Sequence, residues 1–116
     1  MAVNVICKNP QQLLNGIQAA VQNGSVQKWQ VDSDGDFTYI PEPWNKKAWF
    51  RPEVSVGKLV FHILGQKTQR MSTSVYAVYH GRLIEMLLTH FDRSFSRASA
   101  TALPTIGDAV GAEPDE

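Results

Sequence analysis

Residues 26–40, with the sequence VQKWQVDSDGDFTYI, decide the fold that we expect for this chain. Two β-rich runs in this stretch flank the pair Asp34-Gly35. An Asp-Gly pair between such runs favours a two-residue hairpin turn, since both turn positions of such a turn need a positive φ. The stretch therefore predicts an antiparallel hairpin whose strands are residues 26–33 and 36–40.

The two-residue turn also determines which side chains share a face of the hairpin. It pairs Trp29 with Ile40 and places both of them, with Val31, on the core face of the sheet. Phe37 and Tyr39 then lie on the opposite face, where they are candidates for the lining of a pocket.

Two more strands are expected after this hairpin. Residues 44–51 (WNKKAWFR) are β-rich, and Pro52 ends that strand because proline cannot donate to the ladder. Residues 58–64 (KLVFHIL) carry apolar side chains at both odd and even positions. Such a strand is buried on two sides and is typical of the centre of a sheet.

Helical patterns flank the strands. Asn9-Pro10 starts one helix, because Asn caps free amides and Pro is tolerated at the first helical position, and Asn23-Gly24 ends it. Residues 75–92 predict a long helix whose apolar residues cover more than half of its circumference. We expect one side to meet the sheet and the excess to meet a second copy. Gly81 inside this helix indicates close packing against the first helix or a dimer mate.

The predicted fold is therefore α+β. It is a two-layer sandwich of an antiparallel meander of about four strands with two helices on one face. A short fifth strand at residues 2–7 completes the order (β)-α-β-β-β-β-α. We expect one domain over residues 1–97 and a flexible, acidic tail over residues 98–116, where Ser, Ala, Thr, Pro and Gly dominate.

Composition limits the protein classes that need to be considered. The chain has 116 residues, and 11 Lys and Arg balance 11 Asp and Glu, so no net charge attracts it to nucleic acid or acidic membranes. A single cysteine excludes an internal disulfide framework. We find no secretory signal and no run of apolar residues long enough for a membrane span, and we expect a cytoplasmic location without membrane contact.

Catalytic motifs are missing from the sequence. It contains no G-x-S-x-G elbow, no G-x-G-x-x-G loop and no P-loop, so we expect neither an enzyme nor a cofactor. Asp32, Asp34 and Asp36 resemble the opening of an EF-hand loop, but Phe37 and Pro43 occupy positions that require Gly and Glu. The hairpin turn explains these carboxylates better, and no metal site is predicted.

One stretch combines aromatic with basic residues, which is the combination that holds single-stranded nucleic acid. Between Trp44 and Arg70 six basic residues face one acid, Glu53. The candidate contacts for nucleic acid or an acidic partner are Trp44, Lys46, Lys47, Trp49, Arg51, Lys58, Lys67 and Arg70. Basic residues on an edge strand also deter aggregation, so the pattern has an ordinary structural explanation as well.

A second group of candidates belongs to a pocket or polar core. It consists of His62, His80, Phe37 and Tyr39. His62 could pair with His80 or Glu85 between the sheet and the long helix.

These features favour a small non-catalytic protein-interaction module, with self-association through the long C-terminal helix or an exposed sheet face, or with an unidentified protein partner. The first alternative is a nucleic-acid-binding module that uses residues 44–70. The second alternative is a small-ligand-binding protein or enzyme around His62.

Overall fold

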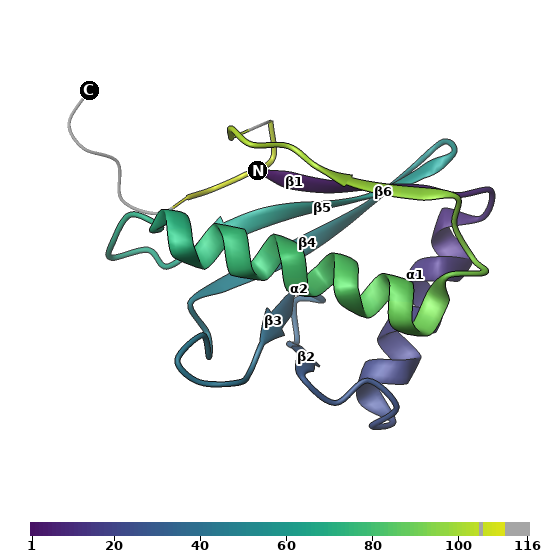
Figure 1. Cartoon of the computed structure of the whole chain (residues 1–116), viewed down its shortest axis with the longest axis horizontal. Coiled ribbons are helices and arrows are strands. Elements are labelled where there is room, and N and C mark those ends of the chain that lie inside the picture. The colour runs from purple at the N-terminus through teal and green to yellow at the C-terminus, as the bar shows by residue number, and fades with distance from the viewer. Residues whose placement is uncertain (105, 111–116) are drawn as a thin grey trace.

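The structure is a computed structural model of the chain and describes residues 1–104 and 106–110. A six-stranded antiparallel sheet carries two helices, and α2 lies across the face of the sheet that is turned to the viewer in Figure 1. The elements are β1 (Ala2–Ile6), α1 (Pro10–Gln22), β2 (Trp29–Val31), β3 (Phe37–Tyr39), β4 (Ala48–Ser55), β5 (Lys58–Gly65), α2 (Thr73–Phe91) and β6 (Arg97–Ala100). The strand order is β2-β3-β4-β5-β1-β6. The predicted α+β class and the order of its elements are confirmed, and β6 is an additional strand.

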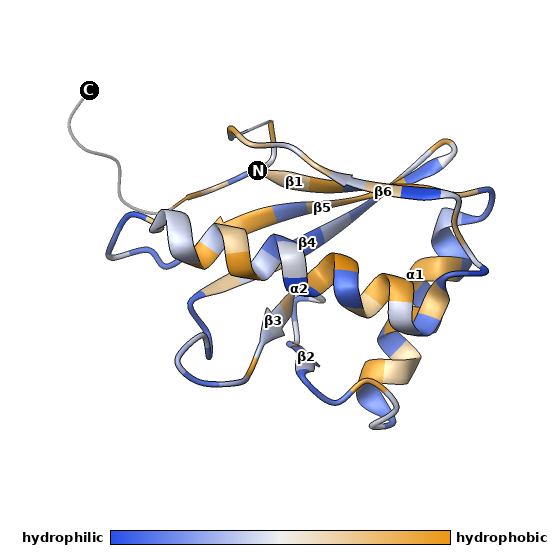
Figure 2. Cartoon of the chain, viewed as in Figure 1, coloured by the Kyte–Doolittle hydropathy of each residue, from blue (hydrophilic) through white to orange (hydrophobic). Residues whose placement is uncertain are grey.

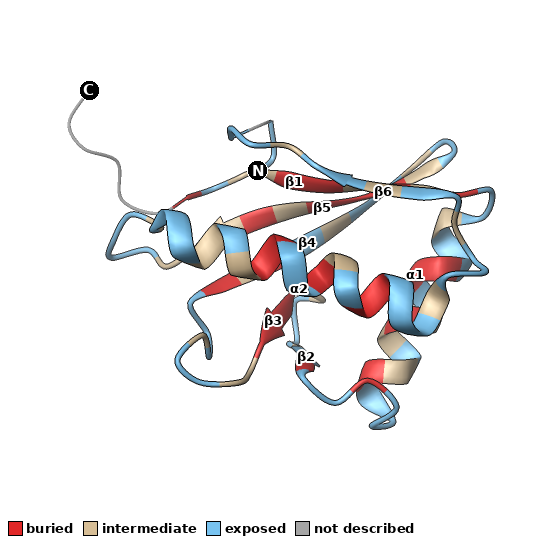
Figure 3. Ribbon diagram, in the orientation of Figure 1, coloured by how far each residue is buried: buried red, intermediate tan, exposed pale blue. Residues whose placement is uncertain are grey.

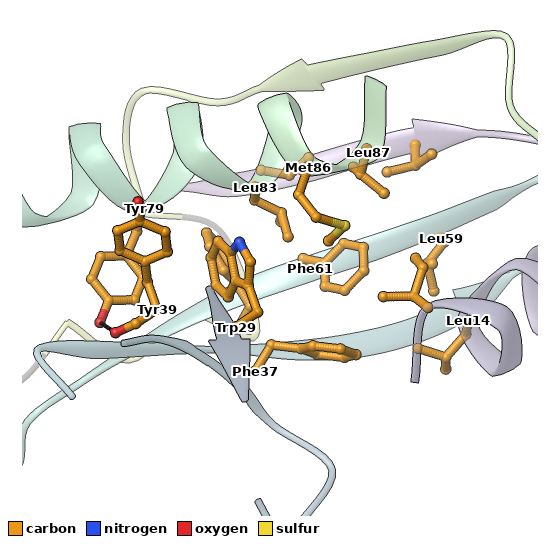
Figure 4. Packing of buried hydrophobic residues seen from close by; sticks show 14 of the residues in the cluster. Leu14, Trp29, Phe37, Tyr39, Leu59, Phe61, Tyr79, Leu83, Met86 and Leu87 are labelled. Carbon is orange, nitrogen blue, oxygen red and sulfur yellow. Dashed lines mark hydrogen bonds between the residues drawn. The ribbon is translucent and has the colours of Figure 1, made fainter. Parts of the chain in front are cut away.

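The core lies between the helices and this face of the sheet (Figures 3 and 4). Aromatic side chains dominate it: the ring of Trp29 lies 5.2 Å from that of Tyr39 and 6.0 Å from that of Tyr79. At the other end, Phe61 packs edge-on against Phe37 at 5.7 Å. Large rings bury more apolar area per residue than aliphatic side chains, so they supply much of the stability of a chain of this size.

The register of the first hairpin differs from the prediction by one residue. Trp29 pairs with Tyr39 and Val31 pairs with Phe37, so Phe37 and Tyr39 lie on the core side with Trp29. Because side chains alternate along a strand, a shift of one residue moves the whole set to the other face. The predicted position of Phe37 and Tyr39 on a pocket-lining face is therefore wrong.

The turn chemistry explains this shift. The amide of Gly35 donates to the carbonyl of Asp32 and the amide of Asp32 donates to the carbonyl of Asp36, which closes a loop of three residues rather than two. The Asp32 carboxylate accepts the amides of Asp34 and Asp36, each at 2.9 Å. Gly35 has a φ of 84°, as a type I turn followed by a left-handed residue requires. One left-handed residue therefore replaces the two that the sequence pattern predicts.

The third predicted strand is displaced as well. β4 begins at Ala48 rather than Trp44 and continues through Pro52 to Ser55. Proline is tolerated where its nitrogen faces an unpaired edge. β3 pairs with β4 at Phe37–Phe50, so β4 has such an edge beyond Phe50.

The segment after α2 extends the sheet beyond residue 97, where we expected a tail to begin. β6 pairs with β1, with Ala98 opposite Val5. Farther along, Ala109 forms a parallel bridge with Leu64 on β5. Residues 105 and 111–116 of the expected tail lie outside the described residues. In the described part of the chain, no helix combines the length and the apolar character needed to cross a membrane.

Candidate functional site

The face of the sheet opposite the helices carries the polar residues that alternate with the core. On β5, Leu59, Phe61 and Ile63 are fully buried in the core, so the intervening side chains point to the other side. The residues of β4 and β1 that pair with these β5 residues point to the same side of the sheet. We call this surface the open face; its members include Asn4, Trp49, Arg51, Glu53, Ser55, Lys58, Val60, His62 and Leu64.

One end of the open face gathers most of the predicted basic and aromatic residues. Ala48 pairs with Gly65, so the loop before β4 and the loop after β5 begin side by side. The side-chain amide of Gln66 joins them by donating to the carbonyl of Lys46 at 3.2 Å. We call this region the basic end; it contains Lys46, Lys47, Trp49, Arg51, Lys67 and Arg70. Lys58 lies at the far end of β5, and Trp44 packs against the core, so these two candidates are not part of it.

Arg51, a member of the basic end, forms an ion pair with Asp36. Its Nε lies 3.0 Å from Oδ1 of Asp36, and a terminal nitrogen lies 2.8 Å from Oδ2. Asp36 is buried, and its hydrogen bonds raise the pKa of Arg51. Asp32, Asp34 and Asp36 can bring carboxylate oxygens within 4.8 Å of one another. Since Arg51 occupies both oxygens of Asp36, the turn and this ion pair account for the acidic cluster.

His62 lies near the middle of the open face, between two carboxylates. Its Nε2 is 2.6 Å from Oε1 of Glu53, and its Nδ1 is 3.7 Å from Oδ1 of Asp108. Asp108 has a fully buried side chain and also accepts the amide of Ile63 at 3.0 Å. The expected contact of His62 with His80 or Glu85 is wrong, because α2 covers the other face of the sheet.

Carboxylates are the polar side chains nearest to the His62 ring among the described residues. Within the described residues both ring nitrogens face carboxylates, and neither faces a hydroxyl or thiol. A shallow depression of about 500 Å³ lies beside it, with Asn4, Ser55 and Lys58 in its wall. Gly107 packs against the ring of His62, and Ile106 lines the depression. Sequence analysis missed these two residues and Asp108, because they come from the segment predicted to be a tail and no local pattern links them to His62.

The remaining pocket candidates are core residues. Phe37 is 0% exposed and Tyr39 is 4% exposed. His80 is 5% exposed, its Nδ1 lies 2.6 Å from the carbonyl oxygen of Tyr76, and its ring meets Phe50 edge-on at 5.2 Å. Burial lowers the pKa of His80 from its usual value, so the ring is held in its neutral form.

A different kind of surface runs along the outward side of α2. Ala77, Gly81, Ile84 and Leu88 follow one another at spacings of four, three and four residues, so they form one line on the helix. We call this line the outer stripe. Leu88 is 55% exposed, and a Cβ added to Gly81 would meet nothing within 4 Å. Figure 2 shows apolar residues along the second half of α2. The structure therefore excludes the packing of Gly81 against α1.

Beside the outer stripe, Arg82 and Glu85 carry opposite charges on the surface of the helix. Their side chains form an ion pair, with nitrogen and oxygen atoms 3.2 Å apart.

Comparisons of this chain with protein-family models, with curated proteins and with solved structures returned no match.

Proposed function

We propose that this chain is a non-catalytic protein-interaction module that pairs with a second copy of itself through the outer stripe of α2. The observation that carries the proposal is the environment of Gly81. Glycine inside a helix costs about 1 kcal/mol relative to alanine. At Gly81 neither a positive φ nor a contact within the described chain accounts for this cost. A second helix that approaches closely at Gly81 does account for it.

The chemistry around the outer stripe suits a second copy. In a dimer with two-fold symmetry the same patch serves both subunits, so the patch must complement itself. Leu88 and the exposed part of Ile84, which also packs against the core, supply apolar surface to bury. Gly81 and Ala77 leave room for a facing backbone. Arg82 and Glu85 lie beside the stripe, where each can meet its opposite charge on an antiparallel partner helix.

The test is the molar mass of the protein in solution. We expect the wild type to pass from 12.9 kDa to twice that mass as its concentration rises in sedimentation equilibrium. Leu88→Glu places a charge in the interface and should weaken the dimer about tenfold or more without changing the far-ultraviolet circular dichroism. Thr89→Glu adds the same charge one residue away, off the stripe, and should leave the dimer intact. A wild type that stays monomeric at every concentration would refute the proposal.

The basic end favours a second candidate function, the binding of single-stranded nucleic acid. Trp49 lies half-exposed on the open face, between two loops that carry Lys46, Lys47 and Lys67. Bases can stack on such a ring while cations meet phosphates. Titration with an oligonucleotide should then show a binding constant that falls linearly with the logarithm of salt concentration. Lys47→Gln should weaken binding and Lys28→Gln, outside the basic end, should not. Absence of binding at low salt removes this candidate.

A further inference from the structure

A cleft of about 940 Å³ lies where β1 leads into α1 and where α2 leads into β6. In Figure 1 this is the end of the molecule at which α1 and the C-terminal end of α2 come together. Its wall reaches the edge of the open face at Ile6, which pairs with Lys58, and it lies apart from the basic end. The side chains that matter most for its character are Cys7, Leu13, Phe91 and Phe95, with Gly16 between them.

The floor of the cleft is apolar. Cys7 is 6% exposed and Leu13 is 4% exposed, and both belong to the hydrophobic core. Phe91 and Phe95 pack against that core but remain partly exposed, so each presents ring surface to the cleft. Burial raises the pKa of the Cys7 thiol, which keeps it protonated and makes it part of the apolar floor.

Backbone hydrogen bonds hold the walls in place. The amide of Cys7 donates to the carbonyl of Gly57 at 3.0 Å, and the amide of Ser96 donates to the carbonyl of Ile6 at 2.8 Å. A third bond, from the amide of Ser94 to the carbonyl of Phe91 at 2.8 Å, closes the turn after α2. The cleft is therefore formed before any ligand enters it, as small-molecule sites usually are.

Gly16 creates the space between the two helices. A Cβ at this position would lie 3.8 Å from Cε1 of Phe91, which is an ordinary van der Waals contact. Any side chain longer than that of alanine would extend into the cleft. The absence of a side chain at Gly16 thus leaves open a volume that a leucine would fill.

The rim of the cleft is basic. Lys8 and Arg93 line it and are exposed, and no acidic residue lies in its wall. Within the part of the chain that the structure describes, neither cation forms an ion pair. Asn9, Gln12 and Ser94 add groups that can donate hydrogen bonds. Two cations that have no ion-pair partner among the described residues, above an apolar floor, favour a ligand with a negative head and an apolar body.

We infer that this cleft binds a small organic anion, with a carboxylate or phosphate head at Lys8 and Arg93 and an acyl chain or ring over Phe91 and Phe95. The cleft volume lies within the range of about 300–1,000 Å³ that is usual for such sites. The tests of this site use Lys8, Gly16 and Arg93, which lie off the outer stripe, so they do not depend on self-association.

Decanoate and decyl phosphate, each below its micellar concentration, are the probes, and decan-1-ol is the neutral control with the same body. Binding is measured by calorimetry and by amide shifts in NMR spectra. We expect saturable binding of at least one anion, with shifts centred on residues 6–16 and 91–96. The alcohol should bind at least about threefold more weakly, the difference expected of one or two partly solvated ionic contacts.

Variants separate the floor from the rim. Gly16→Leu fills the cleft and should weaken the anion about tenfold or more, whereas Ala19→Leu adds the same side chain to an exposed position of α1 and should change nothing. Lys8→Gln and Arg93→Gln should each weaken the anion about threefold and leave the alcohol unchanged, with Lys28→Gln as the control. Absence of saturable anion binding, or equal anion affinity in Gly16→Leu and wild type, would overturn the inference.

Discussion

The phenolic oxygen of Tyr79 on α2 lies 2.6 Å from the carbonyl oxygen of Trp44, to which it donates a hydrogen bond. The same oxygen accepts the amide of Lys47 at 3.2 Å and lies 3.3 Å from the hydroxyl of Thr38. Trp44 and Lys47 belong to the loop between β3 and β4. Figure 4 shows Tyr79 beside Tyr39, the last residue of β3. A single hydroxyl thus attaches the loop between β3 and β4, and with it part of the basic end, to the long helix.

The first prediction concerns this hydroxyl. Tyr79→Phe should reduce the free energy of unfolding by about 1–3 kcal/mol, because the partly buried carbonyl of Trp44 and amide of Lys47 lose their partner. The measurement is denaturation by urea. Tyr76→Phe, on the same helix but without such hydrogen bonds among the described residues, should stay close to the wild type. Equal stability of the two variants would show that water replaces the hydroxyl at no cost.

The second prediction concerns the hairpin turn. Gly35→Ala should destabilise the protein by about 1 kcal/mol or more, since a φ of 84° is strained for any residue with a Cβ. Ser33→Ala, in the same exposed loop, should change stability by less than about 0.5 kcal/mol. Thermal denaturation of both variants decides the matter. If Gly35→Ala melts with the wild type, the turn does not have the three-residue form.

The third prediction compares two arginine–carboxylate pairs. Arg51→Gln should cost about 1–3 kcal/mol of stability, because it leaves the buried carboxylate of Asp36 without its charged partner. Arg82→Gln should cost less than about 0.5 kcal/mol, because Glu85 is 58% exposed and water solvates it. Urea denaturation at low salt measures both. The argument from burial fails if the two variants lose the same stability.

The fourth prediction is a dependence of stability on pH. Burial, the largest cause, lowers the pKa of His80 in the folded state, so the unfolded chain binds the proton more readily. The stability that this neutral histidine provides should be complete above about pH 6.5, the pKa of an unperturbed histidine, and should decline as the pH falls toward the lower folded value.

His80→Asn tests this pH effect, and His90→Asn is its control. In His80→Asn the decline in melting temperature between about pH 6.5 and 5.5 should shrink, since the titrating group is gone. His90 is exposed, and its replacement should leave the decline as it is in the wild type. A wild-type melting temperature that does not change across this interval would contradict the assignment.

Much of the fold follows from local patterns. The helix after Asn9 was predictable because Pro10 and Asn23-Gly24 mark its two ends within the segment itself. The predicted capping by Asn9 is wrong, since its side chain makes no capping hydrogen bond. The central position of β5 was predictable because apolar residues occupy both sets of alternate positions. The strand β6 and the bridge at Ala109 were not, since a polar, small-residue segment becomes a strand only when a sheet edge with free backbone groups lies beside it.

The candidate sites divide in the same way. The charges of the basic end were visible because residues 44–70 carry six basic residues against one acid, but the neutralisation of Arg51 required the position of Asp36, which lies outside that stretch. The cleft at Gly16 was not predicted, because its walls come from segments near both ends of the chain. Lys8 and Arg93 meet there only after β1 and β6 have paired.

Local signals account for the class of fold, the order of most elements and the two helices, because turn residues, helix-end residues and hydrophobic periodicity act over a few positions. Tertiary structure alone decided which face of the hairpin is buried, where His62 and Asp108 meet, and that Gly16 opens a cleft. Each of these depends on contacts between distant segments, where a shift of one residue or the addition of one strand exchanges the buried face for the exposed one.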